Sequence, residues 1–153
     1  DCARSGSHVV CTDINPFAVQ LTRRNIERNQ PLLKGSLEIR QGNLFSVLHE
    51  KEFFNVIIFN PPYLPTKKQE KVGGWFDIAT DGGPDGLSVT KRFIQGLKKH
   101  LLNNGRAYFI FSSLSNRLTL EYYLKNESLS SWIVARRMFD DEELDVYCVT
   151  PAD

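Results

Sequence analysis

Short apolar runs alternate with longer segments of mixed polarity along this chain. Residues 9–11 are apolar, residues 37–40 alternate between apolar and polar, and residues 53–59 form an almost continuous apolar run. The first two patterns predict strands. The third is typical of a strand that is covered on both faces.

Helical spacing predicts the element that separates the first two strands. Asn15 and Pro16 suit the cap and the first position of a helix, which closes near Pro31. Its apolar face holds Phe17, Leu21 and Ile26.

The second half of the chain begins with another amphipathic segment. Residues 87–102 predict a helix that the turn at residues 103–105 ends. The remaining predicted elements are a strand at residues 106–111, a helix at residues 116–125, and strands at residues 131–138 and 144–149. A short link joins the last two strands, which therefore predict an antiparallel hairpin.

This order of elements predicts an α/β fold, in which a doubly wound, mostly parallel sheet ends in a C-terminal antiparallel hairpin. The 153 residues suit one domain. The net charge of +1 gives no general attraction for nucleic acid, and no apolar run approaches the roughly 18 residues of a membrane helix. The three cysteines fit no metal-binding spacing, so we expect no metal site and a cytoplasmic protein with reduced thiols.

Polar residues follow three of the predicted strands. Asp13, Asn43 and Asn60 each stand where a strand ends. Parallel α/β sheets bind their ligands at the carboxyl ends of strands, so we expect these residues to lie along one edge.

The sequence Asn60-Pro61-Pro62-Tyr63 carries the clearest chemistry. An amide nitrogen is a poor nucleophile, because its lone pair is delocalised into the carbonyl group. The Asn60 side-chain oxygen and the Pro61 carbonyl can accept its two N–H hydrogens, while both prolines stiffen the turn. Tyr63 offers a flat face to a planar amide or base. We therefore expect Asn60, Pro61 and Tyr63 to be catalytic and all four residues to bind the substrate.

Residues near the first two strand ends suit a nucleotide-like cofactor. Asp13 could accept hydrogen bonds from ribose hydroxyls, and Ile14 could pack on adenine. The side-chain oxygen of Asn43 could accept a hydrogen bond from the adenine amino group, and Leu44 could stack beside it. Asp13 also suits a helix cap, and Asn43 a simple turn, so both interpretations stay open.

Residues 64–86 predict a long loop, which is usually functional. It carries Trp75, Phe76 and the run Asp81-Gly82-Gly83-Pro84-Asp85-Gly86. We interpret it as a lid that faces the substrate. Lys67, Lys68 and Lys71 could touch phosphate or belong to a solvated loop.

The blocks at residues 10–16, 60–64 and 82–86 resemble those of the HemK/PrmC family of protein-glutamine methyltransferases, and more closely its archaeal and eukaryotic branch. The resemblance implies a class I methyltransferase fold with S-adenosylmethionine as cofactor, which Asp13, Ile14, Asn43, Leu44 and Asn60 would hold. It also implies a substrate, the Gln of the Gly-Gly-Gln motif in a translation termination factor. Members commonly work with a small zinc-binding activator subunit.

The sequence departs from the family in two places. Asn43 stands where the family usually has an acidic residue. The glycine-rich loop that cradles the methionine part of the cofactor has no counterpart upstream of Val9. We therefore expect residues 1–153 to be a single catalytic domain that lacks its first strand, with about 50 or more residues preceding Asp1.

Two other functions suit the same residues. An N6-adenine methyltransferase would present Asn60-Pro61-Pro62-Tyr63 to the amino group of a flipped base in DNA or RNA. A non-catalytic binding scaffold would keep the fold without the glycine-rich loop. The neutral charge argues against the first alternative, and the intact tetrapeptide argues against the second.

Overall fold

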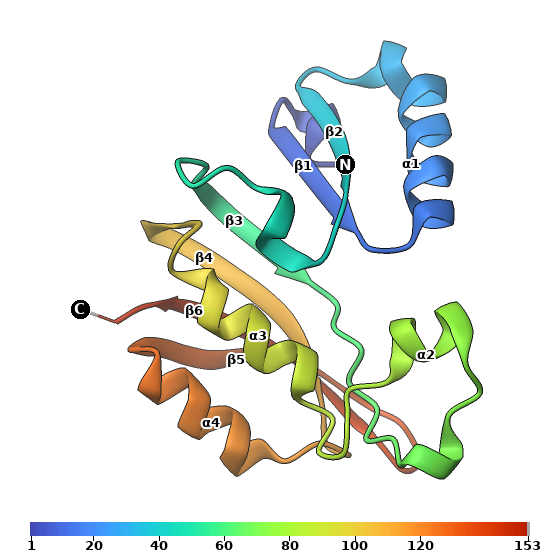
Figure 1. Ribbon diagram of the computed structural model, residues 1–153. Helices are drawn as coiled ribbons and strands as arrows, with labels where there is room; N and C mark the ends of the chain where they lie inside the picture. Colours follow the sequence, from blue (N-terminus) through green and yellow to red (C-terminus); the bar gives the residue numbers. More distant parts are fainter. Residues whose placement is uncertain (153) are drawn as a thin grey trace. The chain divides into compact units, whose positions relative to one another are not determined.

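The computed structural model describes residues 1–152 and has an α/β architecture (Figure 1). Its chain divides into two compact units, Asp1–His49 and the part that begins at Glu50. Each unit contains its own sheet.

The first unit contains a parallel pair of strands with one long helix. Its elements are η1 (Ala3–Ser5), β1 (His8–Asp13), α1 (Pro16–Asn29), η2 (Gln30–Leu32), β2 (Ser36–Gln41) and η3 (Leu44–Val47). The strands β1 and β2 pair in parallel, with Asp13 opposite Gln41. Asn15 caps α1 as predicted, because its side-chain oxygen accepts a hydrogen bond from the Phe17 N–H at 2.9 Å.

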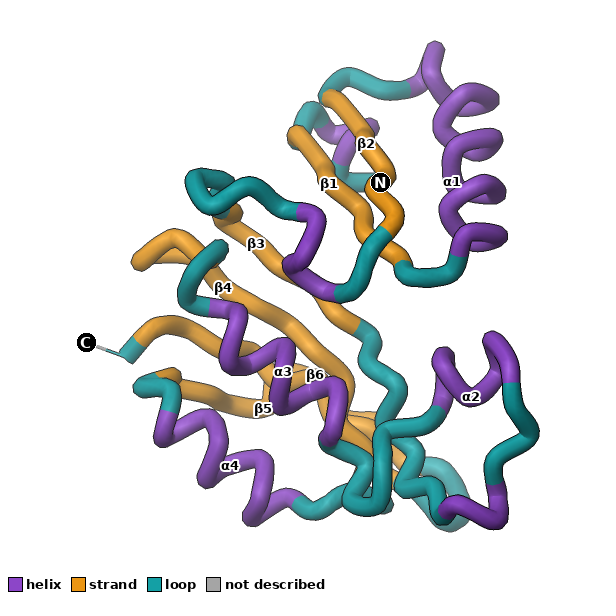
Figure 2. Tube along the Cα trace, in the orientation of Figure 1, coloured by secondary structure: helices purple, strands orange, loops and turns teal. Residues whose placement is uncertain are grey.

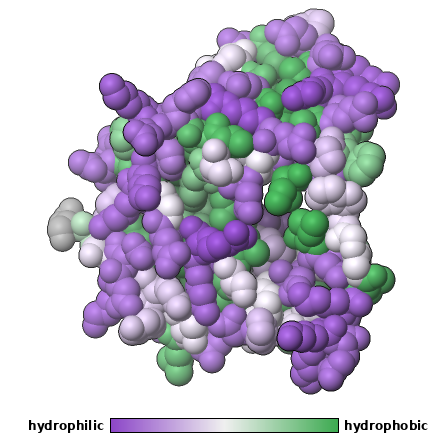
Figure 3. Space-filling model, viewed as in Figure 1, coloured by the Kyte–Doolittle hydropathy of each residue, from purple (hydrophilic) through white to green (hydrophobic). Residues whose placement is uncertain are grey.

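The apolar face predicted for α1 is only partly covered. Val19 is buried, whereas Phe17 and Leu21 are 66% and 58% exposed. Two strands present too narrow a surface to cover a helix of this length, since neighbouring strands are about 5 Å apart. Apolar atoms consequently reach the surface in this unit, as the space-filling view shows in green (Figure 3).

The second unit is built on a four-stranded sheet. Its elements are β3 (Phe54–Phe59), η4 (Lys68–Glu70), α2 (Gly74–Thr80), α3 (Ser88–Leu97), β4 (Leu101–Ser112), α4 (Arg117–Asn126), β5 (Leu129–Met138) and β6 (Glu143–Pro151). The strand order is β3-β4-β6-β5, with β3 parallel to β4 and the other pairs antiparallel. The parallel strands and the C-terminal hairpin confirm the predicted fold class.

Helices α3 and α4 lie side by side on one face of this sheet (Figures 1 and 2). The core between them and the sheet consists of apolar side chains that are almost wholly buried. They include Phe93, Ile94 and Leu97 of α3, Phe109 and Phe111 of β4, Leu120 and Leu124 of α4, and Tyr147 and Val149 of β6. Within residues 1–152, no helix is long and apolar enough to cross a membrane.

Three predicted details of the second unit are wrong. The strand β3 is not covered on both faces, because it is the edge of its sheet and leaves Val56 and Ile58 exposed. The helix predicted over residues 87–102 ends at Leu97, and its last two leucines belong to β4. The segment 64–86 is not all loop, since it contains η4 and α2.

Candidate functional site

The tetrapeptide Asn60-Pro61-Pro62-Tyr63 directly follows β3. Asn60 is exposed, Pro61 is buried and Tyr63 is half-buried. A pocket of about 120 Å³ opens there, lined by Asn60, Pro61, Tyr63, Leu64, Ala79 and Thr80. The motif and the last residues of α2 therefore form one small pocket.

The two predicted acceptors belong to residues that line this pocket. Within residues 1–152, no hydrogen bond occupies the side chain of Asn60 or the carbonyl oxygen of Pro61. Pro61 and Pro62 have no N–H of their own and cannot compete for these oxygens. That an incoming N–H donor binds these two oxygens stays a prediction.

The backbone at Tyr63 is fixed by the loop that follows β4. The Ser115 hydroxyl donates a hydrogen bond to the Tyr63 carbonyl at 2.9 Å. Gly86 lies against the same carbonyl with a φ of +72°, and a Cβ at this position would stand 2.5 Å from the Tyr63 oxygen. Only glycine meets both demands without strain, so Gly86 helps to set the position of Tyr63.

Segment 64–86 is tied to the motif by backbone hydrogen bonds. The Leu64 N–H donates to the Thr80 carbonyl at 3.0 Å, and the Gly82 N–H donates to the Leu64 carbonyl at 2.9 Å. Thr66 is bound in turn to Gly83, with its N–H 3.0 Å from that carbonyl. These bonds place the end of α2 beside the tetrapeptide.

An ion pair closes segment 64–86 on itself. Lys71 Nζ lies 2.5 Å from a carboxylate oxygen of Asp81, and the Gly83 N–H donates to the other oxygen at 2.7 Å. The hydrogen bond from Lys71, followed by that from Gly83, lowers the pKa of Asp81. Lys71 is thus engaged with Asp81, whereas Lys67 and Lys68 are exposed.

Tyr63 is kept as a neutral phenol. Burial raises its pKa, and the negative charge of Glu142 raises it further. Glu142 is held in place by the Ser112 hydroxyl, which donates to its carboxylate at 2.5 Å. Tyr63 therefore offers its ring and its O–H rather than a phenolate base.

Four of the five residues predicted to hold a cofactor lie in the first unit, and the fifth, Asn60, lies in the second. Asp13 stands at the carboxyl end of β1, and its carbonyl accepts a hydrogen bond from the Gly42 N–H at 2.9 Å, beside the end of β2. One carboxylate oxygen of Asp13 accepts from the Asn15 N–H at 2.8 Å. This bond belongs to the turn before α1, and the cap of α1 is Asn15, so the interpretation of Asp13 as the helix cap is wrong.

Two of the other predicted cofactor residues in this unit, Ile14 and Asn43, are exposed. The exposed fraction of Ile14 is 40%. Asn43 is the cap before η3, and its N–H donates to the Ser46 hydroxyl at 3.1 Å. Leu44 has a φ of +52°, a left-handed conformation that costs a non-glycine residue about 1–2 kcal/mol. Such strain gathers at functional sites, so the conformation of Leu44 supports a site here.

The structure thus forms two groups of predicted site residues. Asp13, Ile14, Asn43 and Leu44 lie together at one end of the first sheet, and the tetrapeptide lies in the second unit. The prediction that both groups lie along one edge of a sheet stays a prediction.

Sequence reasoning missed the residues that support Tyr63. Ser115 and Glu142 carried no signal, because chain folding alone brings them to the tetrapeptide. Gly86 belonged to a glycine-rich run that suggested unusual dihedral angles, and its φ confirms that suggestion.

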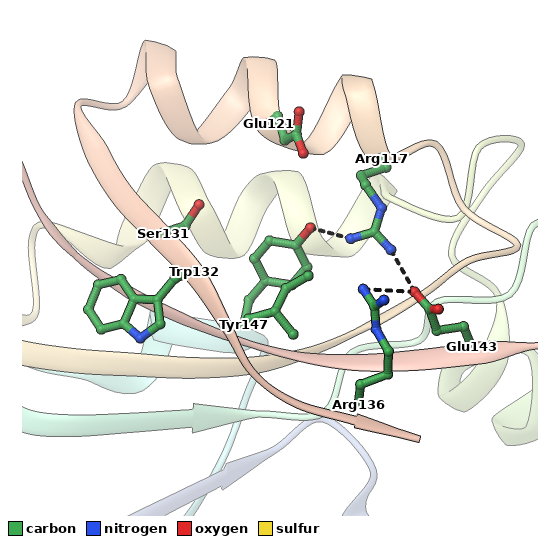
Figure 4. A pocket seen from close by; sticks show the side chains of 8 residues that line it. Arg117, Glu121, Ser131, Trp132, Arg136, Glu143 and Tyr147 are labelled. Atoms are coloured by element: carbon green, nitrogen blue, oxygen red, sulfur yellow. Dashed lines mark hydrogen bonds and ion pairs between the residues drawn. The ribbon is translucent and has the colours of Figure 1, made fainter. Parts of the chain in front are cut away.

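A second, wider pocket of about 630 Å³ lies beside α4, β5 and β6, lined by Arg117, Glu121, Ser131, Trp132, Ile133, Arg136, Glu143 and Tyr147 (Figure 4). Beneath it the side chain of Asp145 is fully buried and accepts hydrogen bonds from Arg117 at 2.8 Å and from Arg136 at 2.7 Å. Burial alone would raise the pKa of Asp145, but the two guanidinium groups hold it below the usual value. Each arginine also approaches Glu143, so the cations of this pocket are already paired.

No cluster of three His, Cys, Asp or Glu side chains suited to a metal ion occurs among residues 1–152.

Comparisons with known proteins find methyltransferases. The family model described as "Methyltransferase small domain" covers residues 2–76. A protein of Methanocaldococcus jannaschii, named as a protein N5-glutamine methyltransferase, is 36% identical over 146 residues, which are 95% of this chain and 71% of that protein. A release factor glutamine methyltransferase of Koribacter versatilis is 29% identical over 63% of this chain, and the match spans 35% of its own length.

A solved structure shares the fold. It is the Mtq2–Trm112 complex of E. cuniculi, responsible for the methylation of the translation termination factor eRF1. The TM-score is 0.57 at 18% identity, over 97% of this chain and 89% of that chain.

Proposed function

This chain belongs to the protein N5-glutamine methyltransferase family, and we propose that it carries the catalytic part of an enzyme that transfers a methyl group from S-adenosylmethionine to the amide nitrogen of a glutamine side chain. The observation that carries the proposal is the pair of open acceptors at Asn60 and Pro61 beside the half-buried ring of Tyr63.

The acceptors solve the problem of a weak nucleophile. One N–H of the glutamine amide donates to the Asn60 side-chain oxygen, and the other donates to the Pro61 carbonyl. These two bonds fix the amide plane and leave the nitrogen lone pair free on one face. Since the acceptors are set before the substrate arrives, positioning supplies most of the rate acceleration.

Bound S-adenosylmethionine would supply an electrophilic methyl group on a sulfonium sulfur. Transfer of this methyl group would form the N–CH₃ bond as the S–CH₃ bond breaks, and would leave the glutamine nitrogen cationic beside the acceptors at Asn60 and Pro61. It then loses one proton to solvent, which leaves a neutral N-methyl amide. The proton leaves after transfer, so Tyr63 need not act as a base, in keeping with its raised pKa.

The residues of the first unit fit an adenosine group. Asp13 would accept hydrogen bonds from ribose hydroxyls, and the exposed side chain of Ile14 would cover one side of the adenine ring. Leu44, in its strained conformation, would cover the other side, next to Asn43.

The proposed substrate is the Gln of a Gly-Gly-Gln motif in a translation termination factor. The bacterial relative is named for release factor glutamine methylation, and the E. cuniculi complex methylates eRF1. That complex contains Trm112 beside the methyltransferase, so we also propose that a small zinc-binding activator subunit works with this protein.

The test is methyl transfer from labelled S-adenosylmethionine to a termination factor or to nucleic acid. We expect label only in the termination factor, and a loss on the order of 10²–10³ in rate for Asn60→Ala, because one preset polar contact to the transition state is removed. Asn55→Ala is the matched control, since Asn55 is exposed on β3 itself. Label in nucleic acid alone would support the adenine methyltransferase instead. No label in either, with binding to the termination factor kept, would support the scaffold.

A further inference from the structure

A tight turn after β4 connects the tetrapeptide to the hairpin of β5 and β6. Within this turn the Ser115 N–H donates to the Ser112 carbonyl at 3.0 Å. The Ser115 hydroxyl donates to the Tyr63 carbonyl. The Ser112 hydroxyl donates to the Glu142 carboxylate at 2.5 Å. Since the two ends of such a turn lie within about 7 Å of each other, the Glu142 carboxylate stands beside the tetrapeptide.

The Glu142 carboxylate is held in this position. Ser112 is fully buried, and its hydroxyl oxygen also accepts a hydrogen bond from the Leu114 N–H at 3.1 Å. The next residue along the hairpin, Glu143, is bonded to Ser113 in both directions. Its carbonyl accepts from the Ser113 N–H, and its N–H donates to the Ser113 hydroxyl, each at 2.9 Å. These bonds keep the carboxylate near the tetrapeptide.

The charge of Glu142 is not compensated by a cation. Within residues 1–152, Glu142 forms no ion pair. Both arginines of the wider pocket already pair with Asp145 and Glu143. Lys71 pairs with Asp81. The carboxylate of Glu142 therefore keeps its full negative charge beside the site.

This charge reaches the pocket. It contributes to the raised pKa of Tyr63, which lines the pocket together with Asn60 and Pro61. None of the residues that line the pocket has a charged side chain, and the exposed Lys67 and Lys68 are not among them. Glu142 therefore places a negative charge beside any acceptor that binds there.

The two classes of acceptor that suit the tetrapeptide differ in charge. A flipped adenine brings the phosphates of its own strand to the rim of the pocket. A glutamine in a polypeptide brings neutral peptide groups. One like charge about 8 Å from a carboxylate weakens binding by roughly fivefold near a protein surface, and each further phosphate adds to this effect.

We propose that Glu142 is a specificity-determining residue, whose carboxylate, held by Ser112 beside the tetrapeptide, excludes acceptors that carry negative charge next to the reacting nitrogen. It would thus select a glutamine in a protein over an adenine in nucleic acid. The inference rests on the proposed function and adds to it a residue that chooses the class of substrate.

The experiment varies one charge on the substrate and one on the protein. The substrates are three forms of a folded termination factor, in which the residue after the glutamine of the Gly-Gly-Gln motif is Asp, Ser or Lys. The variant is Glu142→Gln, which keeps an acceptor for the Ser112 hydroxyl. Asp141→Asn is the matched control, because Asp141 is the exposed neighbour of Glu142 in the same link. Methyl transfer from labelled S-adenosylmethionine gives kcat/KM for each pair.

We expect kcat/KM of the unaltered protein to rise from the Asp form to the Ser form and again to the Lys form, by roughly fivefold at each step in low salt. Glu142→Gln should bring the three forms within about twofold of one another and leave the Ser form as it was. Asp141→Asn should keep the trend. In about 1 M salt the trend of the unaltered protein should flatten, since charges are then screened within about 3 Å.

Equal kcat/KM for the three forms with the unaltered protein would overturn this role of Glu142. Equal losses on all three forms in Glu142→Gln would also overturn it, because they would show that Glu142 only supports the fold of the hairpin. If Asp141→Asn flattens the trend as much as Glu142→Gln, the total charge of the link makes the selection, and Glu142 has no special part. If the unaltered protein methylates none of the forms, the proposed function itself fails, which is seen without any variant.

Discussion

At the scale of single residues, the candidate site depends on two acceptors and on the atoms that hold them. Asn60 and Pro61 supply the oxygens, and Tyr63 supplies the flat face. The position of Tyr63 is set from outside the tetrapeptide, by the Ser115 hydroxyl and by the close approach of Gly86. The geometry of the site therefore depends on these supporting residues as much as on the tetrapeptide.

Gly86→Ala tests this support. Alanine at a φ of +72° costs about 1–2 kcal/mol of stability, and its Cβ would also collide with the Tyr63 carbonyl and with Ser115. We expect a loss of at least about 2 kcal/mol in the free energy of unfolding, together with a clear drop in the rate of methyl transfer. Urea unfolding and single-turnover kinetics measure the two effects.

Gly6→Ala is the control for Gly86. Gly6 has a φ of +102° in the left-handed region, so alanine meets the same kind of backbone strain, but no atom lies within 4 Å of the added Cβ. We expect a loss of about 1 kcal/mol with the activity kept. If both variants lose activity alike, the contact between Gly86 and Tyr63 has no role beyond backbone strain.

At the scale of elements, the sequence predicted helix caps, strands and turns correctly where residues close in sequence determine them. The cap at Asn15, the strands of the hairpin and the turn after Phe59 depend on residues close in sequence, and the structure confirms them. The end of α3 could not be predicted in this way. Leu101 and Leu102 continue the helical spacing of the preceding segment, yet they pair in β4, where Leu101 lies beside Phe54.

Asp81→Asn tests how segment 64–86 is held. Asparagine keeps an acceptor for the Gly83 N–H and removes the ion pair with Lys71. An exposed ion pair contributes less than about 1 kcal/mol, so global stability should barely change. We expect faster amide hydrogen exchange within residues 64–86, measured by mass spectrometry at neutral pH.

The pH dependence of this exchange has a definite sign. The lowered pKa of Asp81 keeps the pair intact at neutral pH, and the pair is lost only as the pH falls through that lowered value. Lys68→Ala, an exposed change in the same segment, should leave the exchange rates as they are. Equal exchange in Asp81→Asn and the unaltered protein would show that backbone bonds alone hold the segment.

At the scale of the whole molecule, the sequence predicted the fold class and the tetrapeptide but not the residues that surround it. The strand β4 runs parallel to β3 and extends beyond it, and the loop that follows brings Ser115 to Tyr63 from 52 positions away in the chain. Residues close in sequence do not indicate a contact over such a separation, so the sequence could not predict it. The same limit applies to Asp145, which the sequence places in an ordinary strand and the structure buries between two arginines.

Asp145 also controls how the protein responds to acid. Its carboxylate joins α4 to β5 and β6 through Arg117 and Arg136, and its pKa in the folded protein is lowered. A lowered pKa means that this contribution to stability is complete above the ordinary pKa of Asp, about 4, and is lost as the pH falls through the folded value. We expect Asp145→Asn to reduce the free energy of unfolding by about 2–3 kcal/mol at pH 7, less than for a fully buried pair because both arginines reach solvent.

Urea unfolding at pH 7, 5 and 3 measures this difference. The difference in free energy of unfolding between the unaltered protein and Asp145→Asn should stay constant from pH 7 to 5. It should narrow at pH 3, below the ordinary pKa of Asp, where the unfolded chain binds a proton that the lowered pKa of the folded protein resists. Glu121→Gln, an exposed change on α4, serves as the control and should remain within about 0.5 kcal/mol at every pH. A gap that does not narrow in acid would mean that Asp145 stabilises the fold through its shape and hydrogen bonds, and not through its charge between the two arginines.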